Sequence, residues 1–263
     1  MPPSSPEFAR RHALEGVDNF RDFGGYVTAC GRGLKAGRLF RSAQHAEASD
    51  ADLAAIRAMN LSAVVDLRRP SERTRQPSRR WEGFAAEVIA NDHEEGEDQW
   101  LVALREAEGA EHFRDYVRGA YRQIPVEPQH VDLFTRYFAI LARADGAVLI
   151  HCTAGKDRTG ILAALTHHLL GVHGDDMVAD YLMTNDAVPY ELRGEQVGKM
   201  LSEACGRALS EPVVRTVISV DPSYLDNAFA GIVEAYGSID AYLEQALGVD
   251  AKTRAAIEAR LLG

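Results

Sequence analysis

Short runs of consecutive apolar and β-branched residues mark the predicted strands. They are SAVVDL at 62–67, GAVLIHC at 146–152 and the shorter AEVIA at 86–90. Uninterrupted apolar runs of this length are typical of strands buried on both faces, as in a parallel sheet. The stretch 26–42, YVTACGRGLKAGRLFRS, mixes β-branched residues with glycines and predicts a hairpin.

Between these strands, apolar residues return at helical spacing. Such patterns occupy HFRDYVRGAYRQI at 112–124 and HVDLFTRYFAILARA at 130–144. Ser49 followed by Asp52 resembles a helix-capping box at the start of another helix. Because strands alternate with helices, the pattern predicts an α/β fold with a central, mostly parallel sheet flanked by helices.

From Thr159 onward the pattern is almost entirely helical. Asp221 and Ser238 each precede a helical run in the position of an N-cap. We therefore expect residues 174–263 to form a helical addition to the sheet.

The composition is that of a folded, acidic protein. The 263 residues include 29 Lys plus Arg against 39 Asp plus Glu, a net charge of −10, and 46% are hydrophobic. This composition supplies a core and excludes disordered and collagen-like classes. No repeat or Pro/Gly-rich linker divides the chain, so we expect one domain over 1–263 with a flexible start at 1–15. The negative charge argues against a nucleic-acid partner.

The cysteines and the apolar stretches bear on the cellular compartment. The sequence has three cysteines, Cys30, Cys152 and Cys205. Because this number is small and odd, the cysteines cannot form a disulfide framework, and such sparse use of cysteine fits a reducing compartment. The sequence shows no signal-like stretch and no run of membrane-spanning length, and GILAALTHHLLGV at 160–172 is better interpreted as a buried helix. We expect a cytoplasmic protein.

The stretch VLIHCTAGKDRTGILAAL carries the clearest chemical signal. An apolar strand runs into Cys152, a loop of small residues follows, and a helix begins near Thr159. Backbone N–H groups in such a loop can point inward, and the helix N-terminus adds a partial positive charge, so the pattern predicts a phosphate cradle. The residues of this predicted cradle are Thr153, Ala154, Gly155, Lys156, Asp157 and Arg158.

Cys152 is the candidate nucleophile. Amid these donors its thiol is expected to ionise to a thiolate that attacks phosphorus, while the planar fork of Arg158 binds two phosphate oxygens. Thr159 is placed to donate a hydrogen bond to the sulfur, and His151 to orient the loop. A buried structural cysteine is the alternative, but it does not explain the strand, glycine, arginine and helix occurring together.

Phosphate transfer also needs a general acid for the leaving oxygen. Asp157 and Asp66 are the candidates, and Asp92 in the acidic run DHEEGED at 92–98 is a weaker third. The residues alone leave this choice open.

Residues 152–159 resemble the signature of cysteine-dependent protein tyrosine phosphatases, which is a cysteine, five intervening residues, an arginine and a serine or threonine. Further motifs are similar, in the same order, to those of the atypical bacterial tyrosine phosphatases. They are HCTAGKDRTG at 151–160, DNFRDFGGY at 18–26, GRLFRSA at 37–43, VVDLR at 64–68, DYLMTND at 180–186 and DPSYLDNAFAGIVEAYGSIDAYL at 221–243. The resemblance covers most of the chain and is weak at 92–112 and 187–216.

The resemblance implies a phosphatase α/β fold and hydrolysis of phosphotyrosine on proteins or peptides, in some members also of phosphoserine, phosphothreonine or phosphoinositides. It implies no metal and no cofactor, and by analogy a helical lid at 187–216. It carries site roles over to Lys156, Asp157 and Asp66. Many tyrosine phosphatases hold the acid in a Trp-Pro-Asp loop, which this sequence lacks, so the choice of acid stays open.

Two other functions share an anion cradle with a cysteine. One is a phosphopeptide-binding module with little turnover, and the other is a sulfur-transfer or arsenate-reducing enzyme. Cys152, Arg158 and Thr159, with two candidate acids, favour the phosphatase.

Several charged residues near the predicted site have two interpretations. Residues 68–80 hold six arginines against one glutamate, and a solvated basic loop is favoured over a guide for phosphorylated partners, with Arg68 the exception. Lys156 either adds a second cation for polyanionic lipids or faces solvent. From the resemblance, Asn19 and Arg21 are expected to brace the phosphate loop or the hairpin rather than to catalyse.

Three histidines near the predicted loop helix, His167, His168 and His173, are not expected to bind metal. Adjacent helical positions point in different directions, and no carboxylate spacing completes a site.

Overall fold

The computed structural model describes residues 10–93, 96, 98–188 and 190–263. In this part of the chain the strands form one sheet in the order β1-β2-β5-β3-β4, and only the β1–β2 pair is antiparallel. The strands are β1 (Arg21–Asp22), β2 (Leu39–Ser42), β3 (Leu61–Asp66), β4 (Glu87–Ile89) and β5 (Ala147–His151). The three strands predicted from apolar runs are β3, β4 and β5, and the predicted α/β class is confirmed.

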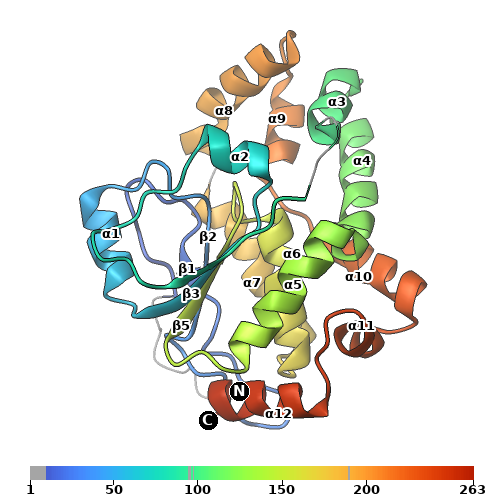
Figure 1. The fold of residues 1–263 in the computed structure, drawn as a ribbon. Coiled ribbons are helices and arrows are strands. Elements are labelled where there is room, and N and C mark those ends of the chain that lie inside the picture. The colour runs from blue at the N-terminus through green and yellow to red at the C-terminus, as the bar shows by residue number, and fades with distance from the viewer. Residues whose placement is uncertain (1–9, 94–95, 97, 189) are drawn as a thin grey trace, which may run out of the picture.

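Both faces of the sheet are covered, as the uninterrupted apolar runs require. Helix α1 (Asp50–Arg57) packs on one face, where Leu149 of β5 joins the same buried cluster as Leu53 and Ile56. On the other face, Val148 and Ile150 join the larger cluster with helices α5 (Pro128–Leu141) and α6 (Asp157–Leu169). Figure 1 shows α1 and the α5–α6 pair on opposite sides of the strands. Successive residues of β5 thus face two separate cores.

The predicted hairpin at 26–42 is correct only in its first half. The Leu34 N–H donates to the Tyr26 carbonyl at 2.7 Å, and Val27 bridges Gly33, so the chain turns back over 26–34. The following residues enter β2, which pairs with β1 on one side and with β5 on the other. The apolar side chains of β2 are buried in the sheet, and this burial outweighs the local hairpin pairing.

The capping box that the sequence predicts at the start of α1 is present. The Ser49 hydroxyl accepts from the Asp52 N–H, and the Asp52 carboxylate accepts from the Ser49 N–H. The same carboxylate accepts from the backbone N–H groups of Glu15 and Gly16, both at 2.8 Å. Residues 1–9 of the start that we expected to be flexible lie outside the described residues, and the part from 10 to 15 is hydrogen-bonded to the body of the protein.

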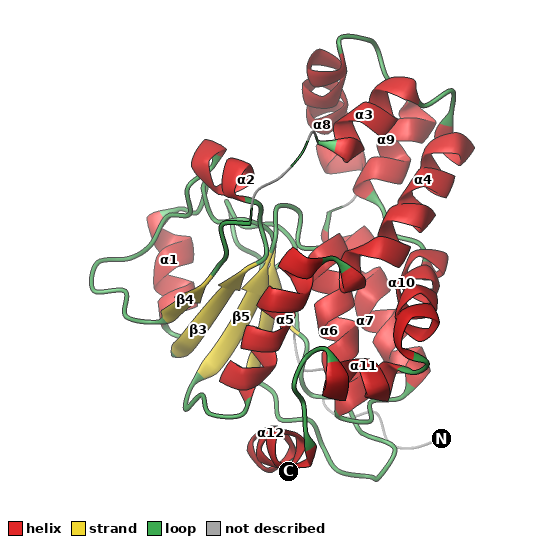
Figure 2. Cartoon of the chain, turned by 45° about the vertical axis from the view of Figure 1, so that its right-hand side comes forward, coloured by secondary structure: helices red, strands yellow, loops and turns green. Residues whose placement is uncertain are grey.

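Some of the remaining helices lie beyond an end of the sheet (Figure 2), and others pack against α6. One group lies beyond the carboxyl ends of the strands (Figure 2): α2 (Pro70–Arg75), α3 (Gln99–Glu106), α8 (Tyr190–Cys205) and α9 (Glu211–Ile218). The others are α4 (Ala110–Gln123), the short 3₁₀ turn η1 (Ile124–Val126), α7 (Gly174–Ala187), α10 (Pro222–Tyr236), α11 (Ile239–Gln245) and α12 (Ala251–Leu261). Within the described residues, no helix combines the length and the apolar character needed to cross a membrane.

Candidate active site

The loop from Cys152 to Arg158 connects β5 to α6 at the carboxyl end of the sheet. Helix α6 begins at Asp157, two residues before the expected start near Thr159. The Cys152 side chain is buried, with the residue 1% exposed. Among the described residues, no hydrogen bond engages the backbone N–H groups of residues 153–158. A row of free N–H groups beside a helix N-terminus is the geometry that binds anions.

The carbonyl groups of the same loop are held by donors from elsewhere in the chain. The Gln44 N–H donates to the Thr153 carbonyl at 3.1 Å. The Asn19 side-chain amide donates to the carbonyls of Ala154 at 3.3 Å and Gly155 at 2.9 Å. Because these contacts hold the carbonyls away from the loop's concave side, the N–H groups are left to face a ligand.

Gly155 is required by both backbone conformation and space. Its φ is +67°, a region that L-residues with a side chain rarely adopt. A Cβ at this position would lie 2.3 Å from the Ser42 carbonyl oxygen of β2. Glycine therefore lets the loop close on the neighbouring strand.

A buried ion network, here called the inner network, lies behind the loop. It consists of Arg21, Arg41 and Asp180, whose side chains are 0%, 0% and 2% exposed. Arg41 Nη1 pairs with Asp180 Oδ2 at 2.8 Å, and Arg41 Nη2 donates to the Gly155 carbonyl at 3.0 Å. Arg21 Nη2 donates to the Asp180 carbonyl at 2.9 Å, and another of its nitrogens holds the Asn19 amide oxygen. Arg41 thus contacts the loop directly, and Arg21 acts through Asn19.

The charges of the inner network stabilise one another. Burial by itself would raise the pKa of Asp180, but the two guanidinium groups outweigh burial and hold this pKa below its ordinary value. Burial, with a further contribution from neighbouring Arg41, lowers the pKa of Arg21 to about 10. Two arginines set against one aspartate leave one formal net positive charge behind the loop.

A second network, here called the outer network, lies on the α2 side of the loop and consists of Arg158, Glu72 and Thr153. Arg158 makes two parallel hydrogen bonds to the Glu72 carboxylate, at 2.6 and 2.8 Å, and a third to the Leu67 carbonyl at 3.0 Å. The Thr153 hydroxyl donates to the same carboxylate, which also accepts from the Arg69 N–H. Burial would raise the pKa of Glu72, yet Arg158 outweighs it and holds this pKa far below its ordinary value.

Asp157 is held by a tyrosine. The Tyr121 hydroxyl of α4 donates to Asp157 Oδ1 at 2.6 Å, and the Lys156 ammonium lies 3.4 Å from the same oxygen. The Asp157 side chain is 17% exposed, so it is reachable from solvent.

Asp66, the other candidate acid, lies at the end of β3 in a different environment. Both of its oxygens accept from Arg68, at 2.9 and 2.7 Å, and its side chain is 5% exposed. Burial would raise the pKa of Asp66, but His151 and Arg68 outweigh it and lower this pKa to about 2. Arg68 also binds the Gln76 carbonyl and the Ser78 hydroxyl. The pair therefore ties the end of β3 to the segment after α2.

His151 is buried between Asp66 and a second histidine. Its Nε2 lies 3.6 Å from Asp66 Oδ2, its Nδ1 lies 3.3 Å from the Cys152 carbonyl, and its ring stacks on His45 at 4.9 Å. Burial lowers the pKa of His151 to about 4, so the ring is neutral at neutral pH.

Lys156 does not face solvent. The interpretation of Lys156 as a solvent-facing side chain is therefore wrong. The residue is 5% exposed, and its ammonium donates to the Ser219 carbonyl at 3.3 Å and lies 5.6 Å from the centre of the Trp100 ring. It links the loop to the end of α9 and to α3.

Neither Thr159 nor Asp92 makes a hydrogen bond to Cys152 in the described part of the chain. The Thr159 hydroxyl is buried and has no hydrogen-bond partner in the described part of the chain. Asp92 has a side chain that is 90% exposed and pairs with Arg73. Of the acidic run at 92–98, residues 94–95 and 97 lie outside the described residues.

The basic segment 68–80 is largely ion-paired rather than free. Arg73 pairs with Asp92, Arg79 with Asp50 at 2.7 Å, and Arg68 is buried against Asp66. The three histidines of and after α6 are separated: His167 binds the Phe23 carbonyl at 2.7 Å, while His168 lies 3.6 Å from Asp240. No group of three metal-ligating side chains occurs among the described residues.

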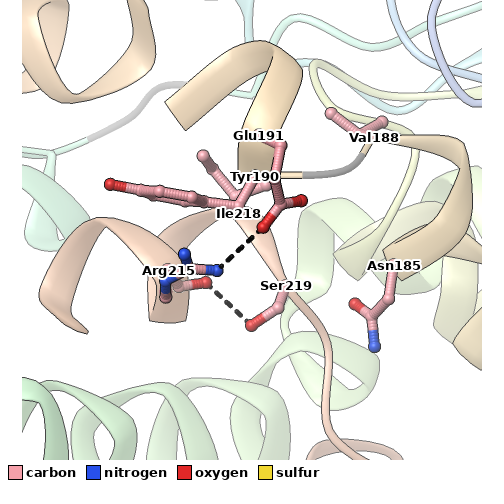
Figure 3. Close-up of a pocket in the computed structure, with 7 residues that line it drawn as sticks. All are labelled: Asn185, Val188, Tyr190, Glu191, Arg215, Ile218 and Ser219. Atoms are coloured by element: carbon pink, nitrogen blue, oxygen red, sulfur yellow. Dashed lines mark hydrogen bonds and ion pairs between the residues drawn. The ribbon is translucent and has the colours of Figure 1, made fainter. Parts of the chain in front are cut away.

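A cavity of about 270 Å³ lies near the loop, between the end of α7, the start of α8 and the end of α9. Figure 3 shows Arg215 paired with Glu191 across it, and Asn185 on its far side. None of its lining residues belongs to the 152–158 loop, but the Ser219 that lines it supplies the carbonyl that Lys156 binds. The cavity is therefore a neighbour of the cysteine site and not the site itself.

Residue-by-residue reasoning missed four residues that hold the loop directly or through a neighbouring side chain. Arg41 and Asp180 lie inside motifs of the family resemblance, but neither motif carries a role at the level of single residues. Glu72 is the one carboxylate in the arginine-rich segment 68–80. A single carboxylate among six arginines could have marked it as an ion-pair partner. Tyr121 lies in an amphipathic helix where an aromatic residue is usually core, so nothing in the sequence marked it.

Comparison with known proteins agrees with this geometry. Residues 12–263 match the tyrosine phosphatase family. A candidate tyrosine-protein phosphatase of Cupriavidus necator is 34% identical over 94% of this chain and 89% of its own length. The triple specificity protein phosphatase PtpB of Mycobacterium tuberculosis is 32% identical over 95% of this chain and 98% of its own length. A tyrosine-protein phosphatase of Nostoc commune is 28% identical over 87% of this chain and 75% of its own length.

The family match covers residues 12–263, the range that holds the loop, both ion networks and the helical addition. This protein belongs to the tyrosine phosphatase family.

Proposed function

We propose that this protein hydrolyses phosphotyrosine in proteins or peptides through a phosphocysteine intermediate formed on Cys152. The observation that carries the proposal is the row of free backbone N–H groups at 153–158, with a buried cysteine at one end and Arg158 at the other. A phosphate dianion would complete the hydrogen bonds of this row and would take the Arg158 donors that Glu72 leaves free.

In the first step the Cys152 thiolate attacks phosphorus, an S–P bond forms and the P–O bond to tyrosine breaks. The leaving oxygen takes its proton from Asp157, and Arg158 with the loop N–H groups stabilises the charge on the remaining oxygens. In the second step water attacks phosphorus and gives a proton to the Asp157 carboxylate. The S–P bond then breaks, which releases phosphate and regenerates the thiolate.

Asp157 is favoured over Asp66 as the acid because of its surroundings. Asp157 is within the loop and partly exposed, and its Oδ2 has no partner among the described residues. Asp66 has both oxygens bound by Arg68, and a carboxyl with a pKa of about 2 holds no proton to donate near neutral pH. We assign Asp66 to support of the loop, together with Arg68, His151, Asn19 and Arg21.

Activity on phosphoserine and phosphothreonine belongs to the same proposal. It is supported by the name of the Mycobacterium tuberculosis relative, which is a triple specificity protein phosphatase. Phosphoinositides are a less supported substrate class, because Lys156, the extra cation of the loop, is already bound to the Ser219 carbonyl and Asp157.

The test is phosphate release from matched phosphotyrosine, phosphoserine and phosphothreonine peptides and from phosphoinositides, by the wild type and by Cys152→Ser. We expect phosphotyrosine to react fastest and the variant to lose at least about a thousandfold in kcat. Acid quench of the wild type during turnover should trap phosphate on the protein, and Cys152→Ser should trap none.

Cys205→Ser is the matched control, since it makes the same change at a partly buried cysteine in α8. It should retain wild-type turnover. A wild type that binds phosphotyrosine peptide without releasing phosphate would instead identify a binding module. Equal losses in the two serine variants would remove Cys152 as the nucleophile.

A further inference from the structure

Two buried tyrosines connect the interior of the protein to Asp157. The Tyr181 hydroxyl of α7 donates to the Tyr121 hydroxyl at 2.7 Å, and the Tyr121 hydroxyl donates to Asp157 Oδ1 at 2.6 Å. Tyr121 and Tyr181 are 0% and 1% exposed. The chain of hydrogen bonds thus ends at the one carboxylate of the loop.

The direction of this chain follows from its donors. A phenol has one proton to donate, so Tyr121 gives its proton to Asp157 and must accept from Tyr181. Burial, and next the nearby Asp157 carboxylate, raise the pKa of Tyr121 well above its ordinary value. Burial likewise raises the pKa of Tyr181 well above its ordinary value, so both tyrosines are neutral donors near neutral pH.

The rings are fixed by packing, so the hydroxyl groups are fixed as well. The Tyr121 ring packs against Tyr224 of α10, with ring centres 5.3 Å apart. The Tyr181 ring lies against Gly160 in the first turn of α6, where an added Cβ would lie 2.8 Å from a ring carbon. The glycine allows Tyr181 to approach the same turn of helix that carries Asp157.

The two carboxylate oxygens of Asp157 have different surroundings. Oδ1 receives the Tyr121 hydrogen bond and faces the Lys156 ammonium, whereas Oδ2 has no partner in the described part of the chain. A general acid needs one oxygen directed at the leaving group, and a fixed second oxygen sets that direction.

We propose that Tyr121, supported by Tyr181, is the positioning residue that directs Oδ2 of Asp157 toward the leaving oxygen. The inference rests on the proposed role of Asp157 as the general acid. Tyr121 does not touch the substrate; it acts by restricting the rotation of the Asp157 carboxyl group.

The test compares leaving groups, because only a poor leaving group needs its proton from the acid. Phenyl phosphate has a poor leaving group and 4-nitrophenyl phosphate a good one. Because kcat/KM reports only the steps up to loss of the leaving group, we expect Tyr121→Phe to lower kcat/KM on phenyl phosphate about 10-fold and to change kcat/KM on 4-nitrophenyl phosphate less than about 3-fold. Tyr181→Phe should show the same pattern with a smaller loss.

Asp157→Asn separates the failure of the positioning role from the failure of the acid. It should lower kcat/KM on phenyl phosphate by about 100-fold or more, and Tyr121→Phe added to it should cause no further loss. If Asp157→Asn does not distinguish the leaving groups, the proposed acid is wrong. If Asp157→Asn distinguishes them but Tyr121→Phe does not, the acid stands and the positioning role is wrong.

Tyr137→Phe is the control for general loosening of α6. Its hydroxyl is buried and bonded to the Thr166 hydroxyl at 2.8 Å, so it removes an equivalent hydrogen bond further along the same helix. It should leave kcat/KM on both substrates unchanged, and a leaving-group pattern equal to that of Tyr121→Phe would overturn the proposal. If Tyr121→Phe does not fold, the Tyr181→Phe result decides.

Discussion

The inner and outer networks hold the same loop from two sides but differ in charge balance and exposure. The inner network sets two arginines against Asp180, and the side chains of Arg21 and Arg41 are fully buried. The outer network sets Arg158 against Glu72, with side chains 15% and 21% exposed. Buried ions without alternative partners cannot rearrange without a large cost in free energy, whereas partly exposed ions can exchange partners. The comparison indicates that the inner network is a scaffold and that the outer one is the part able to respond to a ligand.

Removing the carboxylate of the inner network should have the largest effect on stability. In Asp180→Asn, two buried guanidinium groups lose their counterion, and the free energy of unfolding should fall by about 3–5 kcal/mol. Urea unfolding monitored by circular dichroism measures this loss. Glu234→Gln, which breaks the exposed pair with Arg122, is the control and should cause little change. Equal losses in the two variants would contradict the scaffold role.

The pH dependence of stability should come from buried histidines such as His151 and not from the ions of the inner network. His151 has a folded pKa of about 4 against an ordinary 6.5, so the unfolded chain binds the proton more tightly. The stability from its neutral burial is complete above pH 6.5 and is lost as pH falls toward about 4. At pH 5 the loss from His151 alone is about 2 kcal/mol.

The groups facing the His151 ring are His45, Asp66, Arg68 and Arg80, and the pKa of His45 is also lowered by burial. Urea unfolding at pH 7, 6 and 5 should therefore show a falling midpoint in the wild type and a weaker fall in His151→Asn. Within the inner network, Asp180 and Arg21 keep their charges over this range, because the pKa of Asp180 lies below it and that of Arg21 above it. A midpoint that does not change with pH would show that the buried histidines are not linked to folding.

Weakening the outer network should affect catalysis more than folding. In Glu72→Gln, Arg158 loses its charged partner while the shape of the side chain is kept, so its fork is less well oriented. We expect kcat/KM on phosphotyrosine peptide to fall about 10-fold, equal to about 1.4 kcal/mol. The same variant should change the urea midpoint less than Asp180→Asn does.

Inorganic phosphate as a competitive inhibitor tests the sign of the Glu72 effect. If Glu72 orients Arg158, phosphate should bind more weakly to Glu72→Gln. Tighter binding would instead mean that Glu72 competes with the anion for Arg158, and the outer network would then be an inhibitory contact.

Local patterning was sufficient for the main elements of the fold. The apolar runs that became β3, β4 and β5 are strands because both faces of the sheet are covered, and this requirement is visible in each run separately. The capping box at Ser49 is also a local feature and was predicted correctly. The hairpin at 26–42 failed in its second half because β2 pairs with strands that the local pattern does not contain.

The sequence by itself determined where the proposed chemistry lies, since Cys152, Gly155 and Arg158 lie within seven consecutive positions between a strand and a helix. Only the tertiary structure decided what holds and directs them. Arg41 meets Asp180 across 139 positions of sequence, Arg158 meets Glu72 across 86, and Tyr121 meets Asp157 across 36. Such pairs leave no periodic trace in the sequence, because they form only where packing of the sheet and helices brings distant side chains together and removes them from water.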